Sequence, residues 1–270
     1  MKKFEGFLLC SDLDGTLLTD NKSVSKENSE AIEYFKSEGG LFTFITGRPP
    51  LIAEDIYEMV KPNAPIGCFN GGGIYDFESS KFLWSIELPK EAIELVKSAV
   101  KEIPDIGVQV NTKNRIIFTH ENSTMEWFRS ITNIPNDACD IDEINEPVIK
   151  VVFGHDDGKS IERLSEVLHS HENSQMFDYI RSEEKLYEIL PKGISKGNLL
   201  MKLADILGID RKNTVAVGDY NNDISMIHAA GIGYAVQNAV PEAKAVADRV
   251  TVSNQEHAIA RIVEDLENSN

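Results

Sequence analysis

Two aspartates lie at the end of the first apolar segment of the chain, in the stretch FLLCSDLDGTLLTD at residues 7–20. Because residues i and i+2 of an extended strand point to the same side, the carboxylates of Asp12 and Asp14 are expected to lie together where the strand ends. Two like charges at such short range are costly unless a proton or a cation compensates them. The spacing therefore predicts a site that binds a cation or moves a proton.

Polar residues also end two other apolar segments of strand length. The segment LFTFIT at 41–46 ends at Thr46, and the segment NTVAVGD at 213–219 ends at Asp219. Ligands of open parallel sheets bind at the carboxyl ends of the strands, so these side chains are expected to converge with the two aspartates. Three acidic groups around one point favour Mg²⁺, which prefers oxygen ligands and also contacts phosphate groups.

A calcium-binding EF-hand loop is the competing explanation for clustered aspartates. Such a loop requires Gly at its sixth position and Glu at its twelfth. Counting from Asp12 places Leu17 and Ser23 at these positions, and the count from Asp219 fails in the same way. The EF-hand explanation is therefore rejected.

Apolar segments of strand length alternate with amphipathic segments in both terminal parts of the chain, which predicts a parallel sheet covered by helices on both faces. Ser25 is expected to cap a helix that stops at Gly39 and Gly40, and Pro49 or Pro50 to begin the next helix, which runs to Val60. The other expected elements are strands over 6–11, 41–46, 65–70, 213–219 and 232–236, a loop and hairpin over 71–88, and helices over 195–208, 221–231, from 241, and over 255–268.

The segment between these two parts has a different order of elements. It predicts helices over 89–103, 123–131 and 158–171, and strands over 107–112, 115–120, 148–154, 175–182 and 186–190. The expected fold is therefore α/β: a doubly wound, Rossmann-like parallel-sheet core of residues 1–83 and 189–270, with an inserted α+β cap domain at 84–188 that closes over the site.

Charge and composition exclude several classes of protein. The chain has 270 residues and a formal net charge of −17, and the segment 84–188 alone carries 21 acidic and 11 basic residues. Nucleic-acid binding requires basic surface, so it is not expected. The three cysteines lack the spacing of a zinc site or a disulfide framework, and no apolar segment approaches the length of a membrane span. We expect a cytoplasmic protein that is a monomer or a weak homo-oligomer.

Four short motifs in this order resemble the haloacid dehalogenase superfamily of phosphatases. They are DLDGT at 12–16, TGR at 46–48, SKG at 195–197 and GDYNND at 218–223, with a module inserted between the second and the third. The stretches NGG near Asn70 and EILPKGISKGNLL near Lys196 are similar to the Cof-type branch in particular. The chain departs from the branch at NGGG and at Tyr220, which bears on substrate contacts more than on chemistry.

The resemblance implies a role for each acidic residue. Asp12 attacks phosphorus and forms an aspartyl-phosphate intermediate, and Asp14 protonates the leaving alcohol and then deprotonates the hydrolytic water. The metal, Mg²⁺, is held by Asp12, by the backbone carbonyl of Asp14 and by Asp219, with Asp223 reached through water or in the surrounding shell.

The phosphoryl group needs positive charge and hydrogen-bond donors. Thr46, Gly47, Lys196 and Asn222 are the expected phosphate-binding residues, although Asn222 and Asp223 could also cap the following helix. Further candidate substrate contacts are Arg48, Asn70 and Gly71, and Arg48 could equally form a local salt bridge. In the cap, polar residues that could contact the leaving group, or lie on a solvated face, are Asn111, Arg115, Lys150 and Arg181.

These patterns together predict a Mg²⁺-dependent phosphatase that hydrolyses a phosphorylated small metabolite, for example a sugar phosphate. Two alternatives remain open. The aspartyl-phosphate could be passed to a sugar hydroxyl, as in a phosphotransferase or mutase, or the fold could serve a non-catalytic, Mg²⁺-dependent regulatory protein. The intact Asp12 and Asp14 pair disfavours the non-catalytic alternative.

Overall fold

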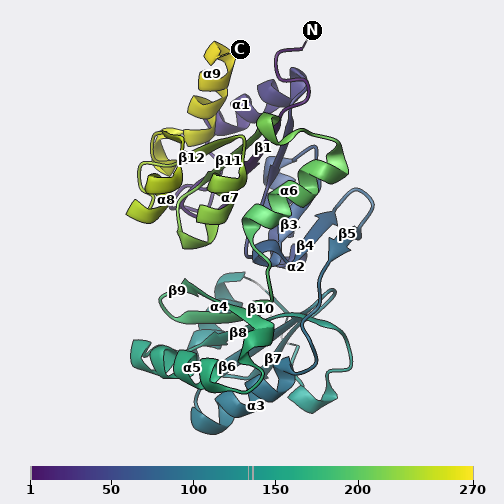
Figure 1. Cartoon of the computed structure of the whole chain (residues 1–270), viewed down its shortest axis with the longest axis vertical. Coiled ribbons are helices and arrows are strands. Elements are labelled where there is room, and N and C mark those ends of the chain that lie inside the picture. The colour runs from purple at the N-terminus through teal and green to yellow at the C-terminus, as the bar shows by residue number, and fades with distance from the viewer. Residues whose placement is uncertain (1, 133, 136, 270) are drawn as a thin grey trace. The chain divides into compact units, whose positions relative to one another are not determined.

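The computed structural model describes residues 2–132, 134, 135 and 137–269, which divide into two compact units (Figure 1). The core unit comprises the described residues up to Trp84 and from Ser195 onwards. The insert unit comprises Ser85–Ile194. That the insert unit acts as a cap stays a prediction.

A five-stranded sheet with the order β13-β12-β11-β1-β2 forms the centre of the core unit, and all four strand pairings are parallel. This sheet confirms the predicted α/β class. Its strands are β1 (Leu8–Ser11), β2 (Leu41–Phe44), β11 (Thr214–Gly218), β12 (Ile232–Ala235) and β13 (Arg249–Val250). Because Leu8 pairs with both Leu41 and Thr214, the carboxyl ends of β1, β2 and β11 lie at one edge.

Within its described residues the core unit has six α-helices. They are α1 (Lys26–Ser37), α2 (Pro50–Val60), α6 (Lys196–Leu207), α7 (Ile224–Ala229), α8 (Pro241–Val246) and α9 (Ala258–Ser269). The α6 and α7 side packs on inward residues of β1 and β11 such as Leu8, Cys10 and Ala216. Helices α1 and α9 lie against each other, and Ala260 N donates to Asn28 Oδ1 at 3.1 Å (Figure 1).

The helix ends follow the expected local signals. Ser25 Oγ accepts a hydrogen bond from Asn28 N at 3.2 Å, so the predicted cap of α1 is confirmed. Ser195 caps α6 in the same way, and Gly208 ends α6 in the left-handed conformation with φ of 69°. The Ser195 cap fixes the first turn of α6, which begins at Lys196.

The third predicted strand takes a different partner. Strand β3 (Ile66–Cys68) pairs antiparallel with β4 (Gly73–Asp76), and β5 (Lys81–Ser85) completes a separate three-stranded sheet. Strand β3 is joined to the end of β2 by the parallel bridge Ile45–Gly67 and by the hydrogen bond from Thr46 N to Gly67 O at 3.0 Å. Hydrogen bonding to the following hairpin therefore redirects this strand, and the hairpin expected over 71–88 is observed.

The insert unit is built on an antiparallel sheet with the order β7-β6-β8-β10-β9. Its strands are β6 (Gly107–Thr112), β7 (Ile116–His120), β8 (Val148–Gly154), β9 (Phe177–Glu183) and β10 (Leu186–Pro191), and its helices are α3 (Ala92–Glu102), α4 (Ser123–Thr132) and α5 (Gly158–Ser170). The strand expected from residue 175 begins at Phe177, because residues 174–176 form a 3-10 turn.

Helices α3 and α5 cover one face of the insert sheet. Val108 and Val110 of β6 and Val151 of β8 join the apolar core beneath these helices. None of the helices within the described residues has the length and apolar character that a membrane span requires.

Candidate active site

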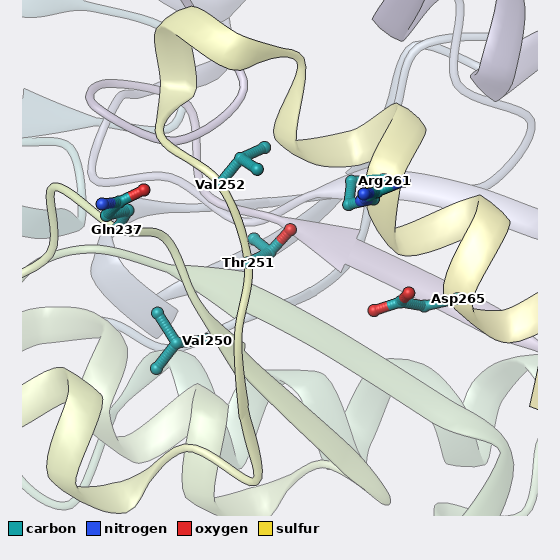
Figure 2. A pocket seen from close by; sticks show the side chains of 6 residues that line it. All are labelled: Gln237, Val250, Thr251, Val252, Arg261 and Asp265. Carbon is teal, nitrogen blue, oxygen red and sulfur yellow. The ribbon is translucent and has the colours of Figure 1, made fainter.

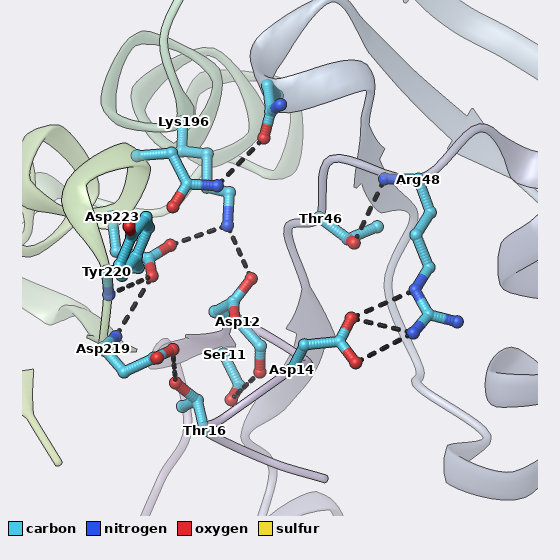
Figure 3. A network of polar contacts seen from close by, with 12 residues as sticks. Ser11, Asp12, Asp14, Thr16, Thr46, Arg48, Lys196, Asp219, Tyr220 and Asp223 are labelled. Carbon is cyan, nitrogen blue, oxygen red and sulfur yellow. Dashed lines mark hydrogen bonds and ion pairs between the residues drawn. The ribbon is translucent and has the colours of Figure 1, made fainter. Parts of the chain in front are cut away.

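Acidic side chains from two strand ends meet at the carboxyl edge of the parallel sheet (Figure 3). Asp12 follows β1 and is held in line by the hydrogen bond from its backbone N to Val217 O at 2.9 Å, while Asp219 follows β11. Oxygen atoms of Asp12, Asp219 and Asp223, one from each carboxylate, lie within 4.8 Å of one another. The predicted convergence of Asp12 and Asp219 is therefore present, and Asp223 belongs to the same group.

Lys196 connects two of these carboxylates. Its Nζ lies 2.5 Å from Asp12 Oδ1 and 2.6 Å from Asp223 Oδ1, and the residue is only 1% exposed. A Cβ on the next residue, Gly197, would lie 2.3 Å from Ser225 O. The glycine thus lets the start of α6 approach α7 closely, which brings Lys196 into the cluster.

The carboxylate of Asp223 also orders the loop after β11. Its Oδ2 accepts hydrogen bonds from Asp219 N at 3.1 Å and from Tyr220 N at 3.0 Å. A Cβ at Gly218 would lie 2.3 Å from Asp223 Cβ, so only glycine permits this turn. Asp223 therefore holds Asp219 in place through the backbone while it binds Lys196 directly.

The loop after β1 packs against the same aspartate. Thr16 Oγ1 donates to Asp219 Oδ1 at 2.8 Å, and Gly15 has a φ of +82°. A Cβ at Gly15 would lie 2.5 Å from Asp219 Oδ2. Gly15 thus permits the close approach of this loop to Asp219, and Thr16 provides a hydrogen bond that fixes the orientation of Asp219.

Asp14 lies beside the cluster and has cationic partners of its own. Arg48 Nη2 lies 2.9 Å and 2.8 Å from its two carboxylate oxygens, and Arg48 Nε lies 3.2 Å from Oδ2 (Figure 3). Lys22 Nζ lies 2.6 Å from Asp14 Oδ1. Of the two possibilities that the sequence left open for Arg48, the structure shows the local salt bridge.

The remaining predicted phosphate and substrate residues form a connected loop. Thr46 Oγ1 accepts from Arg48 N at 3.2 Å, and Asn70 N donates to Thr46 O at 3.1 Å. Asn222 Nδ2 donates to Asn70 Oδ1 at 3.1 Å. A Cβ at Gly47 would lie 2.9 Å from Asn70 Oδ1, so this loop is tightly packed.

Gly71 packs against the residue that caps α6. It has a φ of +114°, and a Cβ there would lie 2.5 Å from Ser195 O. Its backbone thus supports the start of α6, which carries Lys196.

Burial and charge set the protonation of the cluster. Burial, with the nearby charge of Asp223 adding to it, raises the pKa of Asp12 well above its ordinary value. The same two causes raise the pKa of Asp219 to about 6. Burial alone would lower the pKa of Lys196, but Asp12 and Asp223 raise it, so Lys196 carries a charge at neutral pH.

Asp14 behaves differently from Asp12. Burial would raise the pKa of Asp14, but the charges and hydrogen bonds of Arg48 and Lys22 lower it below its ordinary value. In this state Asp14 is a carboxylate at neutral pH and can accept a proton rather than donate one.

Three contributors escaped the sequence reasoning: Lys22, Thr16 and Ser11, whose Oγ donates to Asp12 O at 2.6 Å. The sequence could have indicated Thr16, since it lies within the DLDGT motif. It could not have indicated Lys22, because Lys22 reaches Asp14 only through a turn in which Lys22 has a φ of 56°. The cluster as a whole has the oxygen ligands that a divalent cation needs, with the positive charge of Lys196 beside them.

A cavity of about 380 Å³ lies elsewhere in the core unit, between the edge strand β13 and helix α9 (Figure 2). Its lining residues are Gln237, Val250, Thr251, Val252, Arg261 and Asp265. None of them belongs to the acidic cluster, so this cavity is separate from the candidate active site.

Comparison with known proteins agrees with this geometry. A sequence model of the haloacid dehalogenase-like hydrolases matches residues 9–263. The chain is 27% identical over 272 residues to 5-amino-6-(5-phospho-D-ribitylamino)uracil phosphatase YitU of Bacillus subtilis strain 168, covering 96% of this chain and 97% of that protein. It is 28% identical over 284 residues to phosphatase YwpJ of the same strain, covering 96% and 99%.

A solved structure has the same fold. A haloacid dehalogenase-like hydrolase from Bacteroides thetaiotaomicron superposes with a TM-score of 0.86 at 25% sequence identity, covering 96% of this chain and 99% of that one.

Proposed function

Because this chain belongs to the haloacid dehalogenase-like hydrolases, we propose that it is a Mg²⁺-dependent phosphatase that acts on a phosphorylated small metabolite through an aspartyl-phosphate intermediate. One observation carries the proposal. Lys196 is buried and ion-paired to Asp12, within a group of three carboxylates. This arrangement combines a nucleophile with the positive charge that its attack on a phosphate ester requires.

The carboxylates present fit a divalent cation. Asp12, Asp219 and Asp223 offer oxygen ligands within 4.8 Å of one another. Burial and the nearby charge of Asp223 raise the pKa values of Asp12 and Asp219, so a bound cation would stabilise their charged forms. When bound, Mg²⁺ would neutralise the charge of the phosphoryl group. Asp12 and Asp219 would hold it, together with the backbone carbonyl of Asp14 and with Asp223 in a supporting position.

In the first step, a carboxylate oxygen of Asp12 forms a bond to phosphorus while the bond from phosphorus to the leaving oxygen breaks. The leaving oxygen takes a proton from Asp14. In the second step, Asp14 takes a proton from water, whose oxygen bonds to phosphorus as the bond to Asp12 breaks. Lys196, the Thr46 hydroxyl and Asn222 stabilise the charge of the phosphoryl oxygens.

The salt bridge to Arg48 limits the first step. Asp14 must carry a proton to act as an acid, but Arg48 and Lys22 lower its pKa. We expect these ion pairs to loosen when substrate binds, because the incoming phosphate competes for the guanidinium group of Arg48. Arg48 then changes from a partner of Asp14 to a contact of the substrate.

The substrate class is a phosphate ester of a small metabolite. Sugar phosphates are candidates, and so is the phosphoribitylaminouracil that the name of the relative YitU specifies. Hydrolysis and transfer to a sugar hydroxyl share the first step, so the product distinguishes them.

The test is phosphate release from p-nitrophenyl phosphate and from a panel of sugar phosphates, with Mg²⁺ and after chelation with EDTA. We expect EDTA to abolish activity and Mg²⁺ to restore it. Asp12→Asn should remove activity and the phosphoenzyme, whereas Asp205→Asn, an exposed control on α6, should retain both. Undiminished activity after thorough chelation, or a phosphate adduct on a residue other than Asp12, would refute the proposal. Sugar-phosphate isomers as the main product would indicate a mutase.

A further inference from the structure

The cavity between the edge strand β13 and helix α9 lies within the core unit and is separate from the acidic cluster (Figure 2). Its volume of about 380 Å³ falls within the range of about 300–1,000 Å³ that is common for small-molecule sites. Val250 and Val252 give the lining an apolar part, and Thr251, Arg261 and Asp265 give it a polar part. The cavity is therefore large enough for a small metabolite and has both kinds of surface that such a ligand needs.

Thr251 contributes a buried hydroxyl that has no partner. The residue is 7% exposed, and its Oγ1 forms no hydrogen bond with any described residue. Figure 2 shows this hydroxyl on the side of the strand segment that faces α9. The backbone here is fixed, because Thr251 N donates to Ala235 O at 2.9 Å. Burying a hydroxyl without a partner is costly, so a ligand that bonds to it in the cavity recovers that cost.

Arg261 and Asp265 carry opposite charges on one face of α9, one helical turn apart. They are not paired with each other, because Arg261 Nη1 contacts Glu264 instead. Within the described parts of the chain, no side chain bonds to the Asp265 carboxylate, and no acceptor bonds to Nε or Nη2 of Arg261. These two nitrogens form the edge of a guanidinium group that binds a carboxylate through two parallel hydrogen bonds.

The orientation of Asp265 brings its charge to the cavity. In Figure 2 its carboxylate points from α9 toward the segment of residues 250–252. The cavity thus presents an acceptor carboxylate, a guanidinium edge and a hydroxyl, with apolar valine side chains beside them.

The charged residues of the insert unit that the sequence suggested as substrate contacts differ in this respect. Each is bound within its own unit: Arg115 to Asp137 and Glu146, Lys150 to Glu188, and Arg181 to the backbone carbonyl of Glu184. The carboxylate of Asp265 has no such partner among the described residues, which makes it the stronger candidate for binding a ligand.

We propose that this cavity binds a small zwitterion, namely an α-amino acid with an aliphatic side chain. Its ammonium group donates to Asp265 and Thr251, and its carboxylate accepts from Nε and Nη2 of Arg261. Its side chain lies against Val250 and Val252. A simple anion is repelled by Asp265 and a simple amine by Arg261, whereas a ligand that carries both charges satisfies both residues.

The test is isothermal titration calorimetry of the full chain with L-leucine as the probe. Two analogues of leucine carry one charge each: 3-methylbutylamine lacks the carboxylate, and 4-methylpentanoate lacks the ammonium group. The variants are Asp265→Asn, Arg261→Gln and Thr251→Val. Asp205→Asn and Arg163→Gln are the matched controls, since both residues are exposed and neither lines the cavity.

We expect leucine to bind with a Kd below about 1 mM, and each analogue to bind at least about 10-fold more weakly. Asp265→Asn and Arg261→Gln should each weaken leucine binding by at least about 10-fold, and the controls should match the wild type. Thr251→Val should weaken binding by about 2- to 10-fold. Without leucine this variant should melt no lower than the wild type, because it loses only an unpaired hydroxyl.

The inference is wrong if the Kd for leucine exceeds about 1 mM, if either analogue binds as tightly as leucine, or if the Asp265 and Arg261 variants bind leucine like the wild type. A lower melting temperature for unliganded Thr251→Val would also overturn it, because the hydroxyl would then have a protein partner. All these readouts are of binding and stability, so they do not depend on whether the protein is a phosphatase.

Discussion

Replacing Lys196 with methionine is expected to destabilise the core unit by about 3–5 kcal/mol without metal, because it leaves buried carboxylates without their counter-charge. Lys196 is 1% exposed, and its Nζ lies 2.5 Å from Asp12 Oδ1 and 2.6 Å from Asp223 Oδ1. Methionine retains most of the apolar stem, so the loss reports the charge rather than the packing.

The size of this loss should depend on pH. In the wild type the pKa of Asp12 is already raised well above its ordinary value by burial and by Asp223, and Lys196 opposes the rise. A carboxyl group whose pKa is higher in the folded than in the unfolded state binds more protons when folded, so its contribution to stability falls as pH rises above about 4. Without Lys196 the pKa of Asp12 rises further, so the variant should fall increasingly below the wild type as pH rises through the raised pKa of Asp12 in the wild type.

The assay is urea unfolding at pH 5, 6, 7 and 8 in EDTA, followed by circular dichroism. The double variant Lys196→Met/Asp223→Asn, which removes one buried charge of each sign, should recover at least half of the loss. Lys212→Met is the exposed control, since the side chain of Lys212 is 77% exposed, and it should unfold like the wild type. A loss below about 1 kcal/mol at pH 8, a loss that does not vary with pH, or a double variant as unstable as the single one would refute the reasoning.

Three further predictions concern the loops around the cluster. Thr16→Val removes the hydrogen bond to Asp219, so the Mg²⁺ concentration for half-maximal phosphate release should rise about 10-fold. An unchanged Mg²⁺ dependence would show that Thr16 does not orient this aspartate. Arg48→Gln removes the main cause that lowers the pKa of Asp14 in the free enzyme, so the high-pH decline of kcat/KM for sugar phosphates should move to higher pH. The leaving group of p-nitrophenyl phosphate needs little protonation, so its profile should show no such shift. Identical pH profiles for wild type and variant would contradict the acid role of Asp14. Gly15→Ala places a Cβ 2.5 Å from Asp219 Oδ2 at a φ of +82°. It should therefore destabilise the protein by about 1–2 kcal/mol and weaken Mg²⁺ binding, which thermal melts with and without Mg²⁺ would measure. Normal Mg²⁺ binding would mean that the loop can relax.

The acidic cluster could be anticipated from the sequence because its geometry follows from local rules. Residues that end strands of a parallel sheet lie at one edge, whichever helices connect those strands. Asp12 and Asp219 needed only the identification of two buried strands, β1 and β11. The caps of α1 and α6 are likewise local, since a serine side chain bonds to a backbone N–H three residues later.

The partners of each charge could not be anticipated in the same way. Lys196 lies 184 residues from Asp12 in the sequence, and a close approach of α6 to α7 at Gly197 decides that its Nζ reaches Asp12 and Asp223. Arg48 could have faced either the substrate or Asp14, and only the packed loop shows the salt bridge.

The sequence by itself determined the α/β class and the strand ends that carry acidic groups, because each depends on residues near one another in the chain. The tertiary structure alone decided that β3 pairs with β4, that Asn111 lies opposite Lys150, and that Arg181 donates a hydrogen bond to the backbone of Glu184. Strand order and register bring distant segments together, and no local pattern specifies which of several possible neighbours a side chain meets. The pKa of a buried residue, and hence its charge at a given pH, depends on that neighbour.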